Sequence, residues 1–337
     1  MFSKRKSVSV CIPLYGTEEY LLRCLESVSK QNYDRAEIIV VDDCSPSRNE
    51  ISAKEIIARF KKTSKIPVTY IRHKENLGLV EARRTAVYEA KGDYILILDS
   101  DDQLADGAIK VLYEKALESG ADIVHGKADA FFSETSLAEL DEQQTENYRQ
   151  IILSKINKVN LGELSGADIL SGYFENSNHG GILWAKLIRQ EVYLEAFSHI
   201  PPIFCTMAED VVQYFWIASC AKKYAGIEDV VYIYSINTGI SSRTKIESLD
   251  RWEKVCSTSS VFTAIYTELQ SMEESGQKIL TPRQHSYLDG LCRFYIKNNL
   301  AQLKSAVIPE LQEEAKRLLY DYWGENFVKK IESETAE

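Results

Sequence analysis

The chain has 337 residues, of which 45 % are hydrophobic, and it carries a formal net charge of −10. This length is enough for two domains or for one large α/β domain with an appendage. The acidic balance argues against nucleic acid as a partner, because a phosphate backbone is bound through a basic surface.

Two further features of the composition narrow the class of protein. No apolar run reaches the roughly 18 residues that cross a bilayer, and the basic residues 4–6 lead directly into a strand-like segment instead of a signal peptide. The seven cysteines are an odd number without a Cys-x-x-Cys pair, so neither a disulfide framework nor a zinc site is indicated. We therefore expect a cytoplasmic protein in which cysteines such as Cys11 and Cys24 are small buried residues.

Strands and helices alternate over the first 125 residues. Short β-branched runs predict strands, and apolar residues at helical spacing predict a helix after each of them. A parallel sheet with right-handed crossovers follows from this alternation. Ser47 and Glu50 form an expected capping box for the second helix. The expected strands cover 8–12, 37–41, 68–71 and 94–98, and the other helices cover 21–28, 79–90 and 109–116.

The chain changes character after the fourth of these helices. Residues 127–160 are rich in carboxylates and predict a polar, solvated insertion. A short helix, a strand-like segment, a helix and a strand are then expected over 168–173, 182–188, 210–221 and 230–236. Beyond them the pattern is helical only, with amphipathic stretches over 249–272, 283–303 and 310–331. We expect one domain over 1–245 and a C-terminal helical region over 246–337.

Carboxylates follow two of the predicted strands. Asp99, Asp101 and Asp102 end the run 94–98, and the pair 42–43 ends another buried run. Parallel strands present their carboxyl ends at one edge of a sheet, so these groups and Tyr15 should gather there. Carboxylates that crowd together repel one another unless a cation lies between them, which predicts a Mg²⁺ or Mn²⁺ site completed by phosphates. The alternative is an acidic turn that caps the next helix.

Several short motifs, taken in order and with their spacing, resemble family 2 glycosyltransferases of the GT-A fold. The matching segments are 8–15, 40–45, 75–78, 82–83, 90–94 and 98–102, and more loosely 184–187, 209–210, 232–234 and 241–243. The resemblance implies an α/β fold, with a mostly parallel nucleotide-sugar-binding sheet flanked by helices. The C-terminal helical appendage is expected from the helical pattern alone, because the resemblance covers only about residues 7–243. It also implies transfer of a single sugar from a nucleotide donor, most simply a UDP-sugar, to a glycan or lipid-linked acceptor.

The resemblance implies roles for the acidic residues. Asp101 is the first choice as direct ligand of Mn²⁺ or Mg²⁺, with Asp99 and Asp102 in support. Asp210 is assigned as the general base that deprotonates the acceptor, and Glu209 as a residue that orients the acceptor or the base. A single base without a second carboxylate as nucleophile implies inversion at the anomeric carbon. The alternative for the acidic pair is that it merely caps the helix that follows.

Donor recognition is assigned to the other strand ends by the same resemblance. Asp43 is expected to accept a hydrogen bond from the base N–H of uracil, and Tyr15 to stack on or line the base. Arg83 is expected to pair with the diphosphate or the ribose. The remaining residues assigned to the donor are Pro13, Ser100, Lys186 and Arg243.

Four residues carry weaker expectations. His179, beside two glycines, is expected either to contact the acceptor or a phosphate or to have no direct role. Trp184 is expected to pack in a wall or in the core. Lys186 and Arg243 have a solvated surface charge as their alternative.

Other classes are disfavoured by what the sequence lacks. No G-x-G-x-x-G follows the first strand and no P-loop is present, which argues against a nicotinamide dehydrogenase and a P-loop enzyme. A catalytically silent nucleotide-sugar-binding module and a sugar nucleotidyltransferase remain alternatives. The C-terminal helices are expected to mediate dimerisation or to shield the acceptor cleft. A lipid-linked acceptor would add a peripheral contact with the membrane.

Overall fold

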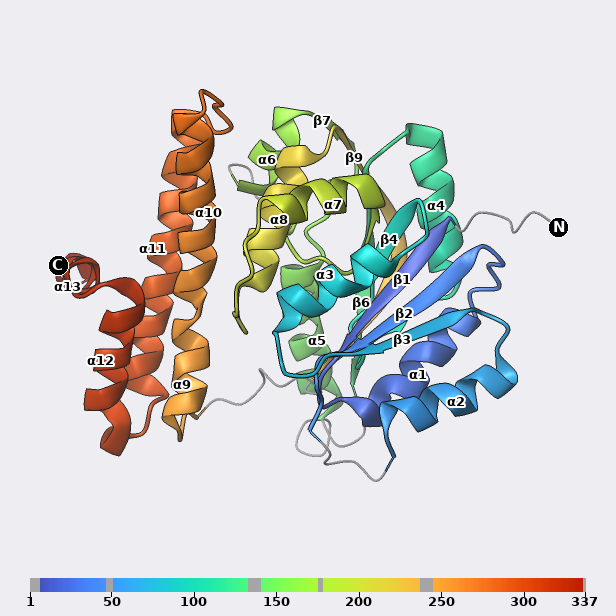
Figure 1. The fold of residues 1–337 in the computed structure, drawn as a ribbon, viewed down its shortest axis with the longest axis horizontal. Coiled ribbons are helices and arrows are strands. Elements are labelled where there is room, and N and C mark those ends of the chain that lie inside the picture. The colour runs from blue at the N-terminus through green and yellow to red at the C-terminus, as the bar shows by residue number, and fades with distance from the viewer. Residues whose placement is uncertain (1–6, 47–50, 133–140, 175–177, 237–244, 336–337) are drawn as a thin grey trace. The chain divides into compact units, whose positions relative to one another are not determined.

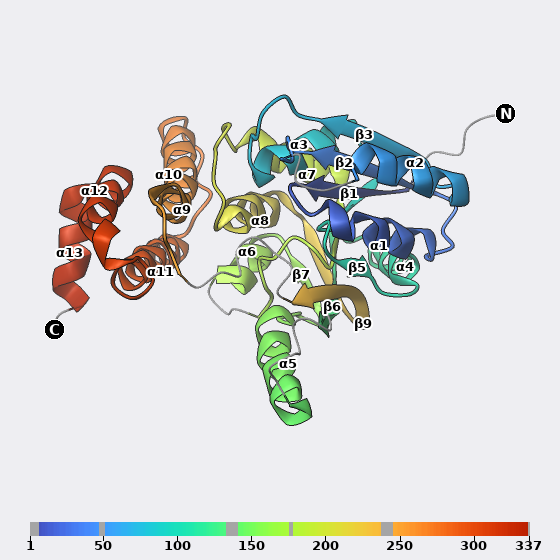
Figure 2. The same ribbon diagram turned by 90° about the horizontal axis from the view of Figure 1, so that it is seen from below.

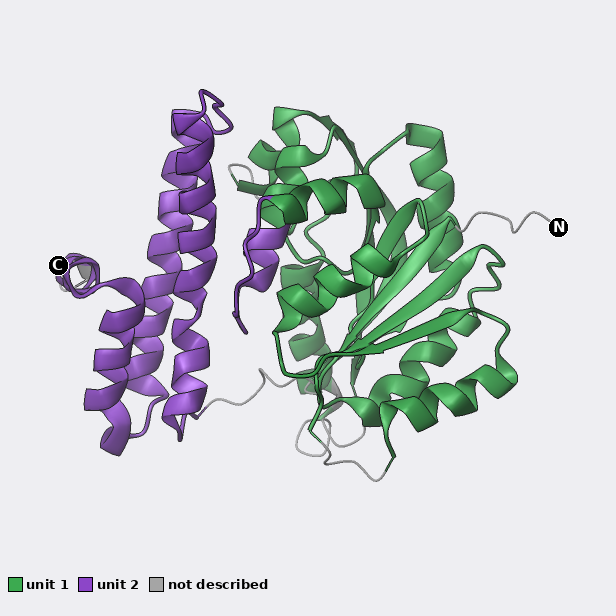
Figure 3. Cartoon of the chain, viewed as in Figure 1, with its two compact units in different colours: residues 1–198, 214–239 green, residues 199–213, 240–337 purple. Residues whose placement is uncertain are grey.

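The computed structural model describes residues 7–46, 51–132, 141–174, 178–236 and 245–335. The chain forms two compact units, shown in Figure 3. The sheet unit comprises residues 1–198 and 214–239, and the helical unit comprises residues 199–213 and 240–337. The division predicted between residues 245 and 246 did not include the segment 199–213 in the helical unit.

Four parallel strands form the first half of the sheet. They are β1 (Val8–Leu14), β2 (Ala36–Asp42), β3 (Val68–Arg72) and β4 (Tyr94–Ile97), in the order β3-β2-β1-β4. Every residue of β1, β2 and β4 is buried, which explains why these strands are continuous apolar runs and not alternating ones. The four predicted strands are confirmed.

The second half of the sheet is mixed. Beyond β4 follow β8 (Lys186–Arg189), β6 (Ile123–Phe132), β9 (Lys223–Ile236) and β5 (Gln103–Leu104), while β7 (Glu163–Ser165) pairs with β9. The strand β8 is antiparallel to both of its neighbours, and β6 is parallel to β9. Within the described residues this is one sheet of nine strands, and the predicted α/β class with a mostly parallel sheet is confirmed.

The predicted polar insertion is only partly correct. Residues 127–132 continue strand β6, where Ala128 and Ala130 are buried and pair with β9. Residues 142–156 form the helix α5 (Glu142–Ile156), whose side chains lie mostly in solvent. The alternating small residues of β6 are a weak strand signal, and the carboxylates that follow them obscured it.

Helices cover both faces of the sheet (Figures 1 and 2). On one face, α1 (Glu18–Ser29), α2 (Ala53–Thr63) and α4 (Ala108–Ser119) share a core with alternate residues of β1 and β2. On the other face lie α3 (Leu79–Glu89) and α7 (Gln190–Ser198). The predicted capping residues Ser47 and Glu50 lie outside the described residues. The capping box of α2 consists of Ser52 and Glu55.

The remaining helices of the sheet unit follow the prediction closely. The helix α6 (Ala167–Phe174) matches the short helix expected there, and α8 (Glu209–Cys220) begins one residue before its predicted start. The first five residues of α8 are grouped with the helical unit and the rest with the sheet unit.

The helical unit has a core of its own. Its helices are α9 (Leu249–Cys256), α10 (Thr258–Glu274), α11 (Pro282–Ser305), the 3₁₀ turn η3 (Pro309–Leu311), α12 (Gln312–Trp323) and α13 (Glu325–Thr335). The indole of Trp252 is fully buried in this core, and its N–H donates to the carbonyl of Ala315 at 2.7 Å. None of the helices in the described ranges has the length and hydropathy of a bilayer-spanning segment.

Two of the predicted C-terminal stretches are each divided into separate helices. The stretch 249–272 is interrupted at Ser257, which ends α9 and precedes α10. The stretch 310–331 is interrupted at Gly324, whose φ of 82° ends α12. A left-handed residue at this point favours glycine because it has no Cβ to clash.

Candidate active site

The acidic segment after β4 lies at the carboxyl end of the parallel strands. The backbone N–H of Leu98 donates to the carbonyl of Cys11 at 3.0 Å, which places the start of this segment beside the second half of β1. The N–H of Asp102 donates to the carbonyl of Asp99 at 3.0 Å and closes a tight turn. The Asp99 side chain is 27 % exposed, and Asp101 is also partly exposed. Two carboxylates therefore remain within reach of a ligand.

Two arginines from helices α3 and α1 contact this turn. The guanidinium Nη2 of Arg83, on α3, lies 3.5 Å from Oδ1 of Asp99, and the Arg83 side chain is 1 % exposed. Nη2 of Arg23, on α1, donates to the carbonyl of Asp101 at 2.8 Å and to Ser235 Oγ at 3.1 Å. Arg83 was expected to contact the donor, whereas the contact present here is with Asp99. Arg23 was missed because a contact with a distant carbonyl leaves no trace in the sequence.

Ser100 and Asp102 face the interior. The hydroxyls of Ser100 and Thr17 are hydrogen-bonded at 2.7 Å, and both residues are buried. One oxygen of Asp102 accepts from the Tyr232 hydroxyl at 2.7 Å, and the other accepts from the backbone N–H of Ser235 at 2.6 Å. The Asp102 side chain therefore ties β9 to the turn. Both oxygens of the buried Asp102 carboxylate accept hydrogen bonds from the protein in this structure, and support of a metal by Asp102 stays a prediction.

The turn creates a strongly negative environment. Burial, followed by the charges of Asp101 and Asp99, raises the pKa of Asp102 well above its usual range. Burial and the same three carboxylates raise the pKa of Tyr234 to about 12. A cation would relieve this repulsion, so Asp99 and Asp101 fit a hard divalent metal.

The protein by itself supplies only part of a metal coordination shell. In the part of the chain that the structure describes, no three His, Cys, Asp or Glu side chains are grouped closely enough to hold a metal. Mg²⁺ commonly binds through one or two carboxylates together with substrate phosphates. The site thus fits a metal that arrives with, or is completed by, a phosphorylated ligand.

The segment after β2 is organised differently. Oδ1 of Asp42 accepts from the Ser45 N–H at 2.8 Å, and Oδ2 accepts from the Tyr70 hydroxyl at 2.7 Å and from Arg72. Burial opposes ionisation of Asp42, but the hydrogen bonds from Ser45, Tyr70 and Arg72 prevail and lower its pKa. Asp42 is thus a charged anchor for the turn that carries Asp43.

Asp43 is fixed by the loop between β3 and α3. Its Oδ1 lies 2.7 Å from Nδ1 of His73 and accepts from the Leu77 N–H at 2.9 Å, and its Oδ2 accepts from the Gly78 N–H at 2.8 Å. The other ring nitrogen of His73 is 2.9 Å from the Thr85 hydroxyl. A carboxylate has about four acceptor positions, so roughly one on Asp43 is left for a ligand.

The end of β1 joins these two acidic turns. Pro13 is buried within β1 opposite Val41, and Tyr15 follows the strand with its side chain partly exposed. The N–H of Gly16 donates to Ser45 Oγ at 3.1 Å. The prediction that Tyr15 and both acidic turns gather along one edge of the sheet is confirmed by the pairing of β1 with β2 and β4.

Lys186 and His179 lie in the interior and not at this edge. The Lys186 side chain is fully buried in β8, its ammonium donates to the carbonyl of Ile182, and it lies 4.9 Å from the centre of the Tyr214 ring. His179 is 1 % exposed, and burial together with the charge of Lys186 lowers its pKa to about 3. Both side chains are thus buried in this structure, and their expected contacts with donor or acceptor stay predictions.

Trp184 packs in the core, as expected. Its ring stacks on Tyr232 with the ring centres 4.5 Å apart and 12° between the planes, and it is 7 % exposed. Tyr232 is the residue that donates to Asp102, so its stacking on Trp184 fixes the position of a hydrogen-bond donor to the acidic turn. Arg243 lies outside the described residues.

The acidic pair Glu209 and Asp210 opens helix α8 and belongs to the helical unit. Both side chains are partly exposed. Burial, followed by the charges of Asp210 and Glu209, raises the pKa of Tyr295 on α11 to about 12. Ala208, directly before the pair, has a φ of 63°. A non-glycine residue in this left-handed conformation is strained, and such strain is concentrated at functional sites.

Comparison with known proteins agrees with this arrangement. Residues 9–174 match the model of the family described as glycosyl transferase family 2. Glycosyltransferase GlyG of Streptococcus pneumoniae is 38 % identical over 120 residues, which are 35 % of this chain and 38 % of GlyG. The matched part is thus well under two thirds of that relative.

Solved structures extend the likeness to nearly the whole chain, at the level of the fold. S. aureus TarS 1–349 in complex with UDP-GlcNAc is 17 % identical with a TM-score of 0.54, covering 96 % of this chain and 92 % of that one. The mannosyltransferase PcManGT from Pyrobaculum calidifontis, in complex with GDP-Man and Mn²⁺, is 15 % identical with a TM-score of 0.51, covering 99 % and 84 %. Through residues 9–174 the chain belongs to glycosyl transferase family 2, and its sheet has the GT-A fold.

Proposed function

We propose that this protein transfers a single sugar from a UDP-sugar to a hydroxyl of a glycan or lipid-linked acceptor, with inversion at the anomeric carbon. The observation that carries the proposal is the pair of partly exposed carboxylates, Asp99 and Asp101, in a negative turn at the carboxyl edge of the sheet. A second, preorganised carboxylate, Asp43, ends the strand on the other side of β1. Membership of the family supports the reaction class.

Asp101 and Asp99 would hold Mn²⁺ or Mg²⁺ together with the donor diphosphate. When bound, the metal neutralises the charge that develops on the leaving diphosphate. Arg83 orients the Asp99 carboxylate, and Arg23 holds the backbone of Asp101. The Mn²⁺ in the PcManGT complex supports the kind of cofactor.

Asp43 would select the base of the donor. Its remaining acceptor position suits the ring N–H of uracil, which donates there, whereas the corresponding nitrogen of cytosine accepts. Tyr15 would line the base from the end of β1, close to Pro13. The complex of TarS with UDP-GlcNAc supports a uridine nucleotide.

Asp210 would take the proton from the acceptor hydroxyl, with Glu209 orienting the acceptor or the base. One base and no carboxylate nucleophile give a single in-line displacement, so an α-linked donor yields a β-linked product. Arg243, which follows β9 in the sequence, would contact the diphosphate. Peripheral contact with a membrane and dimerisation through residues 246–337 stay predictions.

Donor hydrolysis by the full chain tests the proposal directly. We expect hydrolysis of at least one UDP-sugar in a panel of UDP-, GDP- and CMP-sugars, dependent on Mn²⁺ or Mg²⁺ and abolished by a chelator. NMR of the anomeric proton of a transfer product should show inversion. Full activity in excess chelator, a retained α linkage, or tighter binding of GDP than of UDP would each contradict a separate part. Donor binding without hydrolysis or transfer would favour the silent binding module.

The role of Asp210 needs a variant that preserves shape. Asp210→Asn should lower kcat roughly 10²–10⁴-fold, the usual contribution of a general base, while the Kd for UDP stays the same. Asp321→Asn, an exposed aspartate on α12, is the matched control and should turn over normally. Near-normal turnover by Asp210→Asn would remove the assignment.

A further inference from the structure

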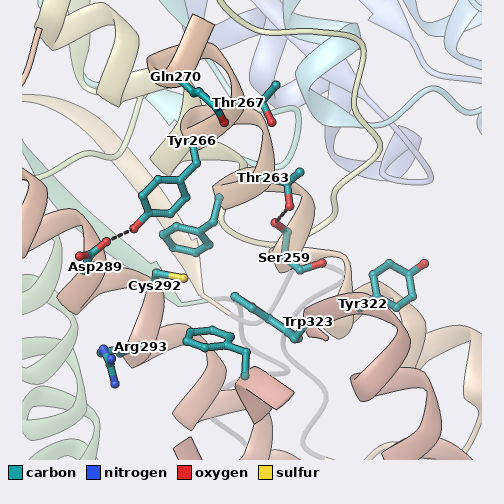
Figure 4. A pocket seen from close by; sticks show the side chains of 12 residues that line it. Ser259, Thr263, Tyr266, Thr267, Gln270, Asp289, Cys292, Arg293, Tyr322 and Trp323 are labelled. Atoms are coloured by element: carbon teal, nitrogen blue, oxygen red, sulfur yellow. Dashed lines mark hydrogen bonds between the residues drawn. The ribbon is translucent and has the colours of Figure 1, made fainter. Parts of the chain in front are cut away.

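A pocket of about 540 Å³ lies within the helical unit, among α10, α11, α12 and the start of α13 (Figure 4). All of its lining residues belong to this unit, and none of them is in the candidate active site described above. Its volume is within the range of small-molecule sites. The pocket is therefore a candidate binding site separate from the donor site.

Aromatic rings form one side of the pocket. The ring centres of Phe262 and Trp323 are 5.9 Å apart, and those of Trp323 and Phe327 are 6.4 Å apart. The indole N–H of Trp323 donates to Asn299 Oδ1 at 2.9 Å, which fixes the ring in place. These rings form a rigid apolar surface, so little side-chain freedom would be lost when a ligand packs on it.

Polar groups line the pocket as well, and Figure 4 shows Tyr266 and Asp289 joined by a hydrogen bond. The Tyr266 hydroxyl donates to Oδ1 of Asp289, whose side chain is exposed. Burial and this contact raise the pKa of Tyr266, so the hydroxyl keeps its proton. Oδ2 of Asp289 is left as an acceptor. Nη1 of Arg293 binds the carboxylate of Glu334 at 2.6 and 2.9 Å, and the guanidinium keeps further N–H donors.

We propose that this pocket binds a neutral pyranose residue of a saccharide. A pyranose has an apolar C–H face, which matches the aromatic side, and a rim of hydroxyls that both donate and accept, which matches Asp289 and Arg293. A phosphate is disfavoured because Asp289 would repel it and Arg293 is already neutralised by Glu334. A purely apolar ligand would desolvate the carboxylate without compensation.

Sugar binding in this pocket would give the helical unit a function of its own, in addition to the chemistry at the donor site. Binding of a sugar here would hold a glycan on the same chain as the donor site and so raise its local concentration. Identification of that glycan as the acceptor rests on the proposed function. Sugar binding by itself does not depend on it.

Ligand-observed NMR on the full chain tests the inference without any assay of activity. The probes are the methyl glycosides of glucose, galactose, mannose and N-acetylglucosamine, with methyl phosphate and a short alkyl alcohol as the rival chemistries. We expect saturation transfer to at least one glycoside, with a Kd of about 1 mM or weaker, and none to the other two probes. Saturation transfer to methyl phosphate or the alcohol in place of every glycoside would overturn the proposal.

Two variants assign the binding to this pocket. Thr263 is exposed on α10 and lines the pocket, so Thr263→Trp should obstruct it and abolish saturation transfer. Asp289→Asn should weaken binding roughly tenfold by loss of a charged acceptor. Asp321→Asn removes the same charge elsewhere in the unit and should bind normally. Circular dichroism and the melting temperature of each variant establish that the fold is retained.

The contradicting outcomes are distinct. Undiminished binding in a folded Thr263→Trp would place the sugar elsewhere, and absence of binding by all four glycosides would refute the saccharide class. Dissociation of a dimer by Thr263→Trp, seen by light scattering, would show instead that a second copy occupies the pocket. Glycoside binding by a chain that hydrolyses no nucleotide sugar would refute the proposed function and leave this inference standing.

Discussion

The two acidic strand ends of the sheet use the same residue type in opposite ways. At the end of β2, Asp42 and Asp43 accept hydrogen bonds from the protein at almost every available position. At the end of β4, Asp99 and Asp101 stay partly exposed and raise the pKa of their neighbours. The β2 end is therefore almost saturated by hydrogen bonds from the protein, whereas the β4 end keeps two partly exposed carboxylates, of which Asp99 faces Arg83. A carboxylate at the end of a parallel strand can stabilise the fold or bind a ligand. The number of hydrogen bonds that it accepts from the protein determines which role is open to it.

Two buried carboxylates make the contrast sharper. Asp42 and Asp102 are both almost fully buried. Burial raises the pKa of each, but Ser45, Tyr70 and Arg72 reverse the effect at Asp42. At Asp102 the charges of Asp101 and Asp99 add to burial, and the hydrogen bonds from Ser235 and Tyr232 only oppose it in part. At the β2 end, Arg72 hydrogen-bonds directly to Asp42. At the β4 end, Arg83 faces Asp99 and a metal cation is expected to arrive with the donor.

The largest effect is expected from breaking the β4 end. Asp101→Asn should lower donor turnover about 10³-fold, since it removes a direct ligand of the metal that stabilises the leaving group. It should also abolish any rise in melting temperature that Mn²⁺ produces in the unsubstituted protein, because a ligand stabilises only a fold that binds it. Turnover assays and thermal melts with Mn²⁺ measure both.

Asp106→Asn is the control for this variant, because Asp106 is exposed and follows the same strand end. It should retain both turnover and the response to Mn²⁺. An Asp101→Asn protein that still responds to Mn²⁺ as the parent does would show that the metal, if bound, is held elsewhere.

A smaller effect is expected from Asp43→Asn at the β2 end. The amide would place an N–H donor against a backbone N–H such as that of Gly78, and it would remove the acceptor proposed for uracil. UDP affinity should fall roughly 10–100-fold, the value of a hydrogen bond to a charged group. The response of the melting temperature to Mn²⁺ alone should persist, and calorimetry with UDP provides the comparison. If Asp43→Asn lost UDP binding and the melting-temperature response to Mn²⁺ to the same extent, the β2 and β4 ends would not have separate roles.

The smallest effect is expected from Asp42→Asn. This substitution should lower the free energy of unfolding by an amount that depends on pH. Loss of the charged acceptor should cost about 1–2 kcal/mol of unfolding free energy at pH 7. The folded pKa of Asp42 lies below its unfolded value of about 3.9. Its contribution is therefore complete above that value and is lost as the pH falls through the folded pKa.

Urea unfolding at pH 7 and at progressively lower pH measures this dependence. The difference between Asp42→Asn and the parent should shrink on acidification. A difference that stays constant to the lowest pH at which both proteins fold would mean that Asp42 is not the charged anchor described here.

The sequence by itself determined the strands and helices that frame the sheet unit. The continuous β-branched runs could only be strands buried on both faces, and the helical spacing between them required parallel crossovers. Strand direction then dictated that Tyr15, Asp43 and Asp99 would share one edge, as they do. These inferences succeeded because the hydrophobic pattern and chain direction are local properties, read directly from consecutive residues.

Only the tertiary structure decided what each polar side chain does. From the sequence, Lys186 is assigned to the donor and Asp102 to support of the metal, yet both side chains are buried. Lys186 lies on the central strand β8, and Tyr232 from β9 donates to Asp102. Arg23 reaches the backbone of Asp101 across 78 residues, and His73 reaches Asp43 across 30. The free energy of a buried polar group depends on the partner that satisfies it. Such partners are distant in sequence, so no local pattern could identify them.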